Sequence, residues 1–313
     1  MIMSAAAESE SVQYCASCGI AGVDDIKLKN CDDCDLVKYC SETCQEDHRS
    51  HHKEECEKRA AELKDEILFK QPEGNHHGDC PICCLPLPID AKKSILMTCC
   101  GKRICNGCNL ANKFREFEGS MDQRCLFCRS PMPSTKEEII KRLMKRIEAN
   151  DPVAICHIGL ERYKEGDYTA AFEYFTKAAS LGDALGDAFA HHQLAGLYRE
   201  GKGVEKDEKR ELYHAEQAAI GGHPEARYNL GCFEYEYGRV DRAVKHWTIA
   251  AKLGDDDSLE YVKDLYKYGD VSKDDFAAAL RGHHAAIVAT KSPQREEAVK
   301  YAKWKAEFLR EGV

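Results

Sequence analysis

The segment that decides the fold reads Cys80-Pro-Ile-Cys83, then Cys99-Cys100, then Cys105-Asn-Gly-Cys108, and finally Cys125-Leu-Phe-Cys128. A tight turn between two closely spaced cysteines directs both thiolates to one tetrahedral zinc ion, about 2.3 Å from each sulfur. Four pairs therefore predict two closed sites with four ligands each. Because a closed site leaves no coordination position for water, we expect these zinc ions to stabilise the fold and to do no chemistry.

The spacing of these pairs resembles that of RING fingers. Between the last two pairs, Leu110, Phe114 and Phe117 recur at helical spacing and Gly119 ends the predicted helix, as in that family. The resemblance implies interleaved ligands, with one zinc ion bound by Cys80, Cys83, Cys105 and Cys108 and the other by Cys99, Cys100, Cys125 and Cys128. The segment departs from the family pattern, since it has no histidine ligand, Leu126 replaces a common proline and Asn112 replaces a bulky apolar residue.

A second group of ligand-type residues comes earlier in the chain. Its four pairs are Cys15-x2-Cys18, Cys31-x2-Cys34, Cys40-x3-Cys44 and His52-x3-Cys56. The last two pairs have helical spacing, so both members of each pair lie on one face of a helix. The spacing and the flanking residues resemble the MYND finger at all eight ligand positions. The resemblance implies one zinc ion on Cys15, Cys18, Cys40 and Cys44, and another on Cys31, Cys34, His52 and Cys56.

The MYND resemblance also implies peptide binding, because members of this family bind proline-rich peptides beside a tryptophan. Arg49 stands at that tryptophan position in this chain. The alternative is a zinc-stabilised fold without a peptide ligand, because closed zinc sites act first as folding devices.

A helical repeat begins near Asp151. Each copy has a small residue in its first helix, at Gly159, Ala195 and Gly231, and a Tyr-x2-Gly end, and its second helix contains an Ala-Ala pair. Such hairpins cannot bury their own apolar faces, so copies stack into a solenoid. The second copy resembles a Sel-like repeat, and the first and third copies are closer to tetratricopeptide repeats. A weaker fourth copy starts near Ser258, and an amphipathic helix over 296–309 is predicted to cap the stack.

The predicted fold class is two small cross-braced zinc-binding modules followed by an all-α helical-repeat domain, an α-solenoid. The predicted order is a disordered N-terminus (1–14), a MYND-type finger (15–56), a helix and linker (57–79), a RING-like finger (80–131), a connecting helix (132–150) and Sel-like or tetratricopeptide-like repeats (151–313). His76 and His77 fall in the linker, and Cys84 is a surplus cysteine that we interpret as a packed thiol.

Composition narrows the expected compartment and partners. The chain has 313 residues, 18 cysteines and a formal net charge of −9. The first residues do not resemble a secretory signal and no apolar run is long enough for a membrane span, so we expect a cytoplasmic or nuclear protein. In a reducing compartment, paired cysteines bind metal more often than they form disulfides. The negative charge argues against general nucleic-acid binding, and the expected partners are proteins.

Two functions remain open at this stage. In the RING family the domain holds a ubiquitin-loaded conjugating enzyme and orients it towards a substrate, so the protein needs no nucleophile of its own. The resemblance places Ile82 at the enzyme contact and Arg129 at the position that hydrogen-bonds both ubiquitin and the enzyme. The MYND finger or the repeats would recruit the substrate. The alternative is a non-catalytic adaptor in which all three parts bind proteins.

Overall fold

The computed structural model describes residues 13–22, 26–182 and 184–310. Most of the segment predicted to be disordered, residues 1–14, lies outside the described residues. The chain forms two compact units, residues 1–70 and residues 71–313.

The first unit is a small finger on a long helix. Strand β1 (Lys29–Asn30) pairs antiparallel with β2 (Lys38–Tyr39), and α1 (Glu42–Leu68) follows. Ser41 caps α1, since its hydroxyl accepts a hydrogen bond from the Cys44 backbone N–H at 3.2 Å. The helix continues through residue 57 without a break, so the predicted separate helix after the finger is the second half of α1. The core of the finger is formed by Cys15, Cys31, Cys34 and Tyr39.

The second unit begins with residues 80–131, here called the second cysteine module. A short 3-10 helix, η1 (Ala91–Lys93), leads into β3 (Ser94–Leu96), which pairs antiparallel with β4 (Arg103–Cys105). Helix α2 (Asn106–Glu118) starts directly at the Cys105–Cys108 pair and ends at Gly119, as predicted. The core of the module combines ligand-type cysteines with Leu87, Met97 and Ile104.

Helix α3 (Lys136–Glu148) connects this module to the repeats. Thr135 caps it by accepting from the Glu138 N–H at 3.2 Å, while the Glu138 carboxylate accepts from the Ser134 N–H at 2.9 Å. The arrangement is a variant of the capping box in which the carboxylate reaches back to the residue before the N-cap. Leu143 is fully buried against the first repeat helix, and Arg146 donates to the Thr98 carbonyl at 3.2 Å. The helix therefore contacts both neighbours, as expected of a connector.

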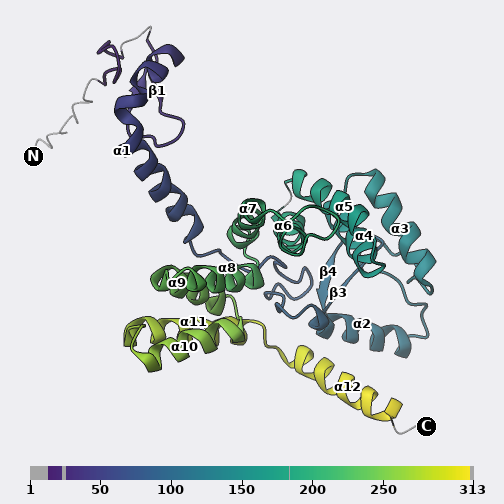
Figure 1. The fold of residues 1–313 in the computed structure, drawn as a ribbon. Helices are drawn as coiled ribbons and strands as arrows, with labels where there is room; N and C mark the ends of the chain where they lie inside the picture. The colour runs from purple at the N-terminus through teal and green to yellow at the C-terminus, as the bar shows by residue number, and fades with distance from the viewer. Residues whose placement is uncertain (1–12, 23–25, 183, 311–313) are drawn as a thin grey trace, which may run out of the picture. The chain divides into compact units, whose positions relative to one another are not determined.

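Within the described part of the chain, four antiparallel helical hairpins form the solenoid (Figure 1). The hairpins are α4 (Pro152–Lys164) with α5 (Tyr168–Ser180), α6 (Ala184–Glu200) with α7 (Glu208–Ile220), α8 (Pro224–Glu236) with α9 (Val240–Lys252), and α10 (Asp256–Tyr268) with α11 (Lys273–Ala289). The predicted fourth copy is therefore a complete hairpin.

Glycine permits the close approach within a hairpin. A Cβ atom on Gly159 of α4 would lie 2.8 Å from the ring of Phe175, which is fully buried on α5. Gly231 of α8 faces the buried Trp247 of α9 in the same way. A large aromatic ring thus fills the space that the missing side chain leaves.

The linker before the second cysteine module is packed on the repeats. His76 is 8% exposed, and its backbone N–H donates to the Gly222 carbonyl between α7 and α8 at 3.0 Å. Its ring stacks on that of His223. His76 and His77 lie in the linker and belong to none of the four metal-type clusters. The sequence did not show that this linker packs on the repeats, because the partner residues lie far away in the chain.

The last helix, α12 (Pro293–Arg310), does not cap the repeats as predicted. Its main packing partner is α2 of the second cysteine module. Tyr301 meets Phe114 edge to face, with ring centroids 5.7 Å apart. Of the residues described in α12, only Arg295 and Ala298 are buried. The amphipathic pattern predicted a packed helix correctly, but a pattern does not specify which surface receives the helix.

Candidate metal centres

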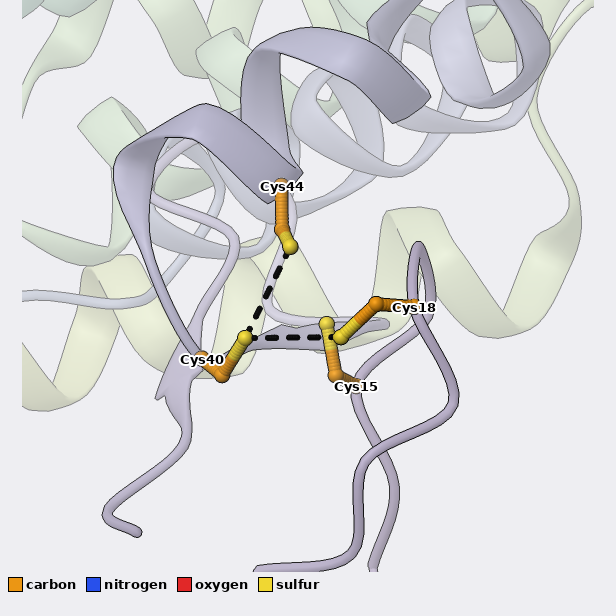
Figure 2. A group of neighbouring side chains, drawn as sticks. All are labelled: Cys15, Cys18, Cys40 and Cys44. Atoms are coloured by element: carbon orange, nitrogen blue, oxygen red, sulfur yellow. Dashed lines mark hydrogen bonds between the residues drawn. The ribbon is translucent and has the colours of Figure 1, made fainter.

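The first metal-type cluster joins the start of the finger to the start of α1. The sulfurs of Cys15, Cys18, Cys40 and Cys44 converge, and all lie within 4.8 Å of one another (Figure 2). The sulfurs of Cys18 and Cys40 are 3.5 Å apart, and those of Cys40 and Cys44 are 3.6 Å apart. Cys40 precedes the capping residue Ser41, and Cys44 lies in the first turn of α1. This pair therefore spans the start of the helix, and the prediction that both of its members lie on one helix face is wrong for Cys40.

The second cluster of the finger contains Cys31, Cys34, His52 and Cys56. His52 and Cys56 lie one turn apart on α1, and His52 is 4% exposed. The His52 Nε2 atom lies 3.1 Å from the Cys34 sulfur, and the Cys31 and Cys56 sulfurs are 3.7 Å apart. The four pairs therefore interleave in the order first with third and second with fourth.

The second cysteine module repeats this arrangement. One cluster contains Cys80, Cys83, Cys105 and Cys108, and the other contains Cys99, Cys100, Cys125 and Cys128. Sulfur separations are 3.9 Å for Cys83 and Cys105, and 3.6 Å for Cys100 and Cys125. The adjacent Cys99 and Cys100 both reach the same cluster.

A shared backbone turn directs both sulfurs of a pair inward. After four of the pairs, the next residue has a positive φ: Gly19 (74°), Asp35 (57°), Cys84 (54°) and Arg129 (59°). In each case its N–H donates to the carbonyl of the first cysteine, at 2.8–3.1 Å. Cys84 is exposed, so its interpretation as a packed thiol is wrong. It occupies the left-handed position of its turn, where residues other than glycine are uncommon.

The clusters fit zinc. Tetrahedral coordination at about 2.3 Å per sulfur places neighbouring sulfurs ~3.8 Å apart, which the four distances from 3.5 to 3.9 Å approach. The same crowding opposes four thiolates without a cation. The neighbouring sulfurs of Cys18 and Cys44 raise the pKa of Cys40 to about 12, and burial raises the pKa of Cys56 to about 12. A divalent ion removes this penalty by binding the thiolates.

The two residues predicted to contact a conjugating enzyme lie in two of these turns. Ile82 lies between Cys80 and Cys83, and the residue is 43% exposed. Arg129 follows Cys128 and is exposed. Asn112 on α2 accepts a hydrogen bond from Arg115 at 2.7 Å, and Leu126 packs partly into the module core.

A pocket on the repeats offers a second kind of site. Its volume is about 170 Å³, and helices α6 and α8 contribute most of its lining, including His192, Gln193, Arg199, Glu225 and Asn229. His192 lies 3.5 Å from the Glu225 carboxylate, which lowers the pKa of Glu225. The pocket therefore presents a guanidinium and amides beside an acidic rim.

One residue beside the metal clusters has no signal in the sequence. Arg295 of α12 donates to the Cys83 sulfur at 3.3 Å, although the two residues lie 212 positions apart in the sequence. A single arginine in an amphipathic helix gives no signal of such a contact.

Comparison with known families identifies the modules. The profile of the MYND finger matches residues 15–56, and that of the Sel1 repeat matches 154–183, 188–223 and 224–255. The chain contains a MYND finger and Sel1 repeats. The MYND finger is a zinc-binding module, and the remaining clusters are compatible with an additional zinc module. The repeats form an all-α solenoid. The first and third copies match the Sel1 profile as the second does, so their assignment to tetratricopeptide repeats is not needed.

The similarity to two rodent proteins covers about half of the chain. "DAP3-binding cell death enhancer 1" is 26% identical in Mus musculus and 32% identical in Rattus norvegicus, in each case over 51% of this chain and 38% of the relative. The chain thus spans well under half the length of these relatives. Among solved structures, a Sel1 repeat protein from Oxalobacter formigenes is 25% identical over 58% of this chain and 73% of its own, with a TM-score of 0.42. A protective antigen of uropathogenic Escherichia coli with an SLR fold is 28% identical over 49% of this chain and 33% of its own, with a TM-score of 0.39.

No helix among the described residues is both long and apolar enough to span a membrane. The MYND finger and the Sel1 repeats are protein-interaction modules.

Proposed function

We propose that this protein is a zinc-stabilised adaptor that joins protein partners through its MYND finger, its second cysteine module and its repeats. The observation that carries the proposal is the closure of all four clusters. Each fills four coordination positions with protein side chains, so zinc has no position left for a substrate. The metal would then hold binding surfaces in shape.

The repeats are proposed to take a segment of a partner at the pocket lined by α6 and α8. Arg199 and Asn229 offer hydrogen-bond donors from two successive repeats, an arrangement suited to an extended chain with its own carbonyl and carboxylate groups. The rodent relatives are named for binding a protein, DAP3, which favours protein binding as the function of this chain.

The pocket is tested by affinity capture with the full-length protein and with the double variant R199A/N229A. A matched control is Lys209→Ala, an exposed residue on α7 that is not part of the pocket lining. Partners that use the pocket should be lost from the double variant and kept by the control. Identical captured sets from all three proteins would contradict this part of the proposal.

We further propose that the second cysteine module makes the adaptor a ubiquitin ligase of the RING type. The observation in favour is the exposure of Ile82, a large apolar side chain between two metal ligands, which suits a contact with a conjugating enzyme. Arg129, exposed after the last ligand, would hydrogen-bond ubiquitin and the enzyme together. Catalysis would consist of holding the ubiquitin thioester in a reactive orientation.

The backbone at Arg129 suggests a clean variant for this test. Because its φ is 59°, Arg129→Gly removes the side chain without straining the turn. Cys84→Gly changes the corresponding position of the Cys80–Cys83 turn, where φ is 54°, and serves as the matched control. Autoubiquitination with purified components and a panel of conjugating enzymes should fall strongly in R129G and in I82A but not in C84G. If the wild-type protein is inactive with every conjugating enzyme, the ligase proposal fails and the adaptor function remains.

A further inference from the structure

The C-terminal helix reaches the zinc-type cluster of the second cysteine module through one buried arginine. Arg295 lies in the first turn of α12 and is 8% exposed. One terminal nitrogen, Nη1, donates to the Pro86 carbonyl at 2.7 Å and to the Thr290 carbonyl at 2.8 Å. The other, Nη2, donates to the Leu85 carbonyl at 3.1 Å and to the Cys83 sulfur at 3.3 Å.

The approach of α12 depends on a glycine beside two of the cluster's cysteines. Gly107 lies between Cys105 and Cys108, at the start of α2. A Cβ atom there would lie 2.8 Å from the Arg295 backbone nitrogen and 2.8 Å from the Gln294 carbonyl carbon. The backbone cannot move away as a flexible side chain could. The first turn of α12 therefore rests directly on the segment that carries two ligand-type sulfurs.

The charges at this contact are complementary when the cluster holds its ion. Four thiolates and one Zn²⁺ carry two net negative charges. A guanidinium that donates to a thiolate makes a charge-assisted hydrogen bond, which is stronger than a neutral one. The contact belongs to the Cys80, Cys83, Cys105 and Cys108 cluster.

We propose that Arg295 is an outer-shell partner of this zinc site, and that zinc binding there and docking of α12 stabilise each other. Hydrogen-bond partners outside the first ligands orient those ligands, and their loss lowers metal affinity about 10–100-fold. Because coupling between two binding events is reciprocal, an empty site must in turn weaken the docking of α12. The stability of this helix therefore depends on the metal content of a module that lies far from it in sequence.

The proposal is tested on the full-length, zinc-loaded protein with two independent variants. Arg295→Met removes the charge and keeps an unbranched side chain. Gly107→Ala keeps the arginine in the sequence but adds a methyl group that blocks the approach of α12. Arg310→Met is the matched control, since Arg310 is an exposed arginine at the other end of the same helix. Transfer of zinc to a coloured chelator measures the release rate of each ion, and hydrogen exchange measures the protection of residues 293–310.

Both variants should release one ion of the set about 10-fold faster or more and should lose protection in α12, whereas the control should match the wild type. Protection of α4–α9 serves as the internal check that the chain is folded. In the reverse direction, Cys83→Ser should lower the protection of α12, and Cys84→Ser should not. Release rates that stay at the wild-type value while α12 loses protection would overturn the proposal, as would a C83S protein whose α12 exchanges normally.

Discussion

The rings of His76 and His223 are stacked, with centroids 4.1 Å apart and an angle of 20° between their planes. His192 stacks on the same His223 ring at 4.1 Å and 16°, and His77 lies against His76 at 3.9 Å. Four imidazoles thus meet where the linker joins the repeats. A stack of this kind requires mostly neutral rings, because adjacent imidazolium ions repel each other.

Acid should loosen this junction before it unfolds the repeats. Burial lowers the pKa of His76 to about 2 and that of His77 to about 4, with a further contribution from Arg103, and burial lowers the pKa of His223 well below its usual value. The Glu225 carboxylate beside His192 is the acidic group at the stack. The unfolded chain takes up protons below about pH 6.5 and the folded junction does not, so the stability contributed by these rings is full above pH 6.5 and falls as the pH drops through 4 towards 2.

The measurement is hydrogen exchange of residues 71–79 at about pH 7.5 and about pH 5.5, on either side of the usual histidine pKa, corrected for the intrinsic rate. We expect protection to fall at the lower pH in the wild type. His76→Leu removes one titrating ring, so its junction should respond less to pH, whereas His284→Leu, at a histidine of α11 outside the stack, should behave as the wild type. An equal response in all three proteins would show that the stack does not cause it.

Two glycines of the repeats should respond to alanine in opposite directions. Gly159→Ala places a methyl group 2.8 Å from the fully buried ring of Phe175, and overpacking of this kind costs about 1–3 kcal/mol. Gly196 of α6 has open space around the position that an alanine methyl group would take, with nothing within 4 Å, so alanine there should stabilise the helix by roughly 1 kcal/mol.

The change in stability of both variants can be measured by thermal unfolding of the zinc-loaded protein, followed by the helical circular dichroism signal. The midpoint should fall for G159A and rise for G196A. A rise for G159A would mean that α4 and α5 are less closely packed than the structure has them.

The sequence predicted features that depend on nearby residues, and it did not predict contacts between residues far apart in the chain. Cysteine pairs and Ala/Gly seams are encoded within a few residues, so the pairs and the repeat hairpins could be predicted directly. Which pairs share a cluster was implied only by the resemblance to the two finger families. The partner of Arg295 lies 212 positions away, and that of His76 lies in a turn between two repeats. Cys84 occupies the same left-handed turn position as Gly19 and Asp35. These three residue types differ, so the shared position shows only when the turns of the structure are compared.

Substitution of Cys99 should lower the zinc content of the protein, and substitution of Cys84 should not. The wild type is expected to bind four zinc ions, one for each cluster. Cys99 belongs to a cluster although it adjoins Cys100, whereas Cys84 is exposed and belongs to none of the four. Metal analysis after dialysis should therefore give fewer than four ions for Cys99→Ser and four for Cys84→Ser. Four tightly held ions in C99S would remove Cys99 from the ligand set.

Removal of zinc should divide the chain into a metal-dependent and a metal-independent part. Structural zinc contributes about 10–16 kcal/mol to the folding of a small domain at pH 7, more than the net stability of such a domain. All four clusters lie between Cys15 and Cys128. The repeats instead bury apolar side chains, among them Phe175, Leu194 and Trp247, and hold no metal cluster in their described residues. Neighbouring hairpins stabilise one another.

A strong chelator should therefore unfold the MYND finger and the second cysteine module while α4–α11 stay folded. Limited proteolysis in chelator should leave a resistant fragment that begins between Ser134 and Asp151, because the capped α3 stays packed on α4. Its C-terminal end should fall near Thr290, since α12 loses its main packing partner when the second cysteine module unfolds. A fragment that still contains α12 would show that this helix docks without the metal, and uniform digestion of the whole chain would show that the repeats depend on zinc as well.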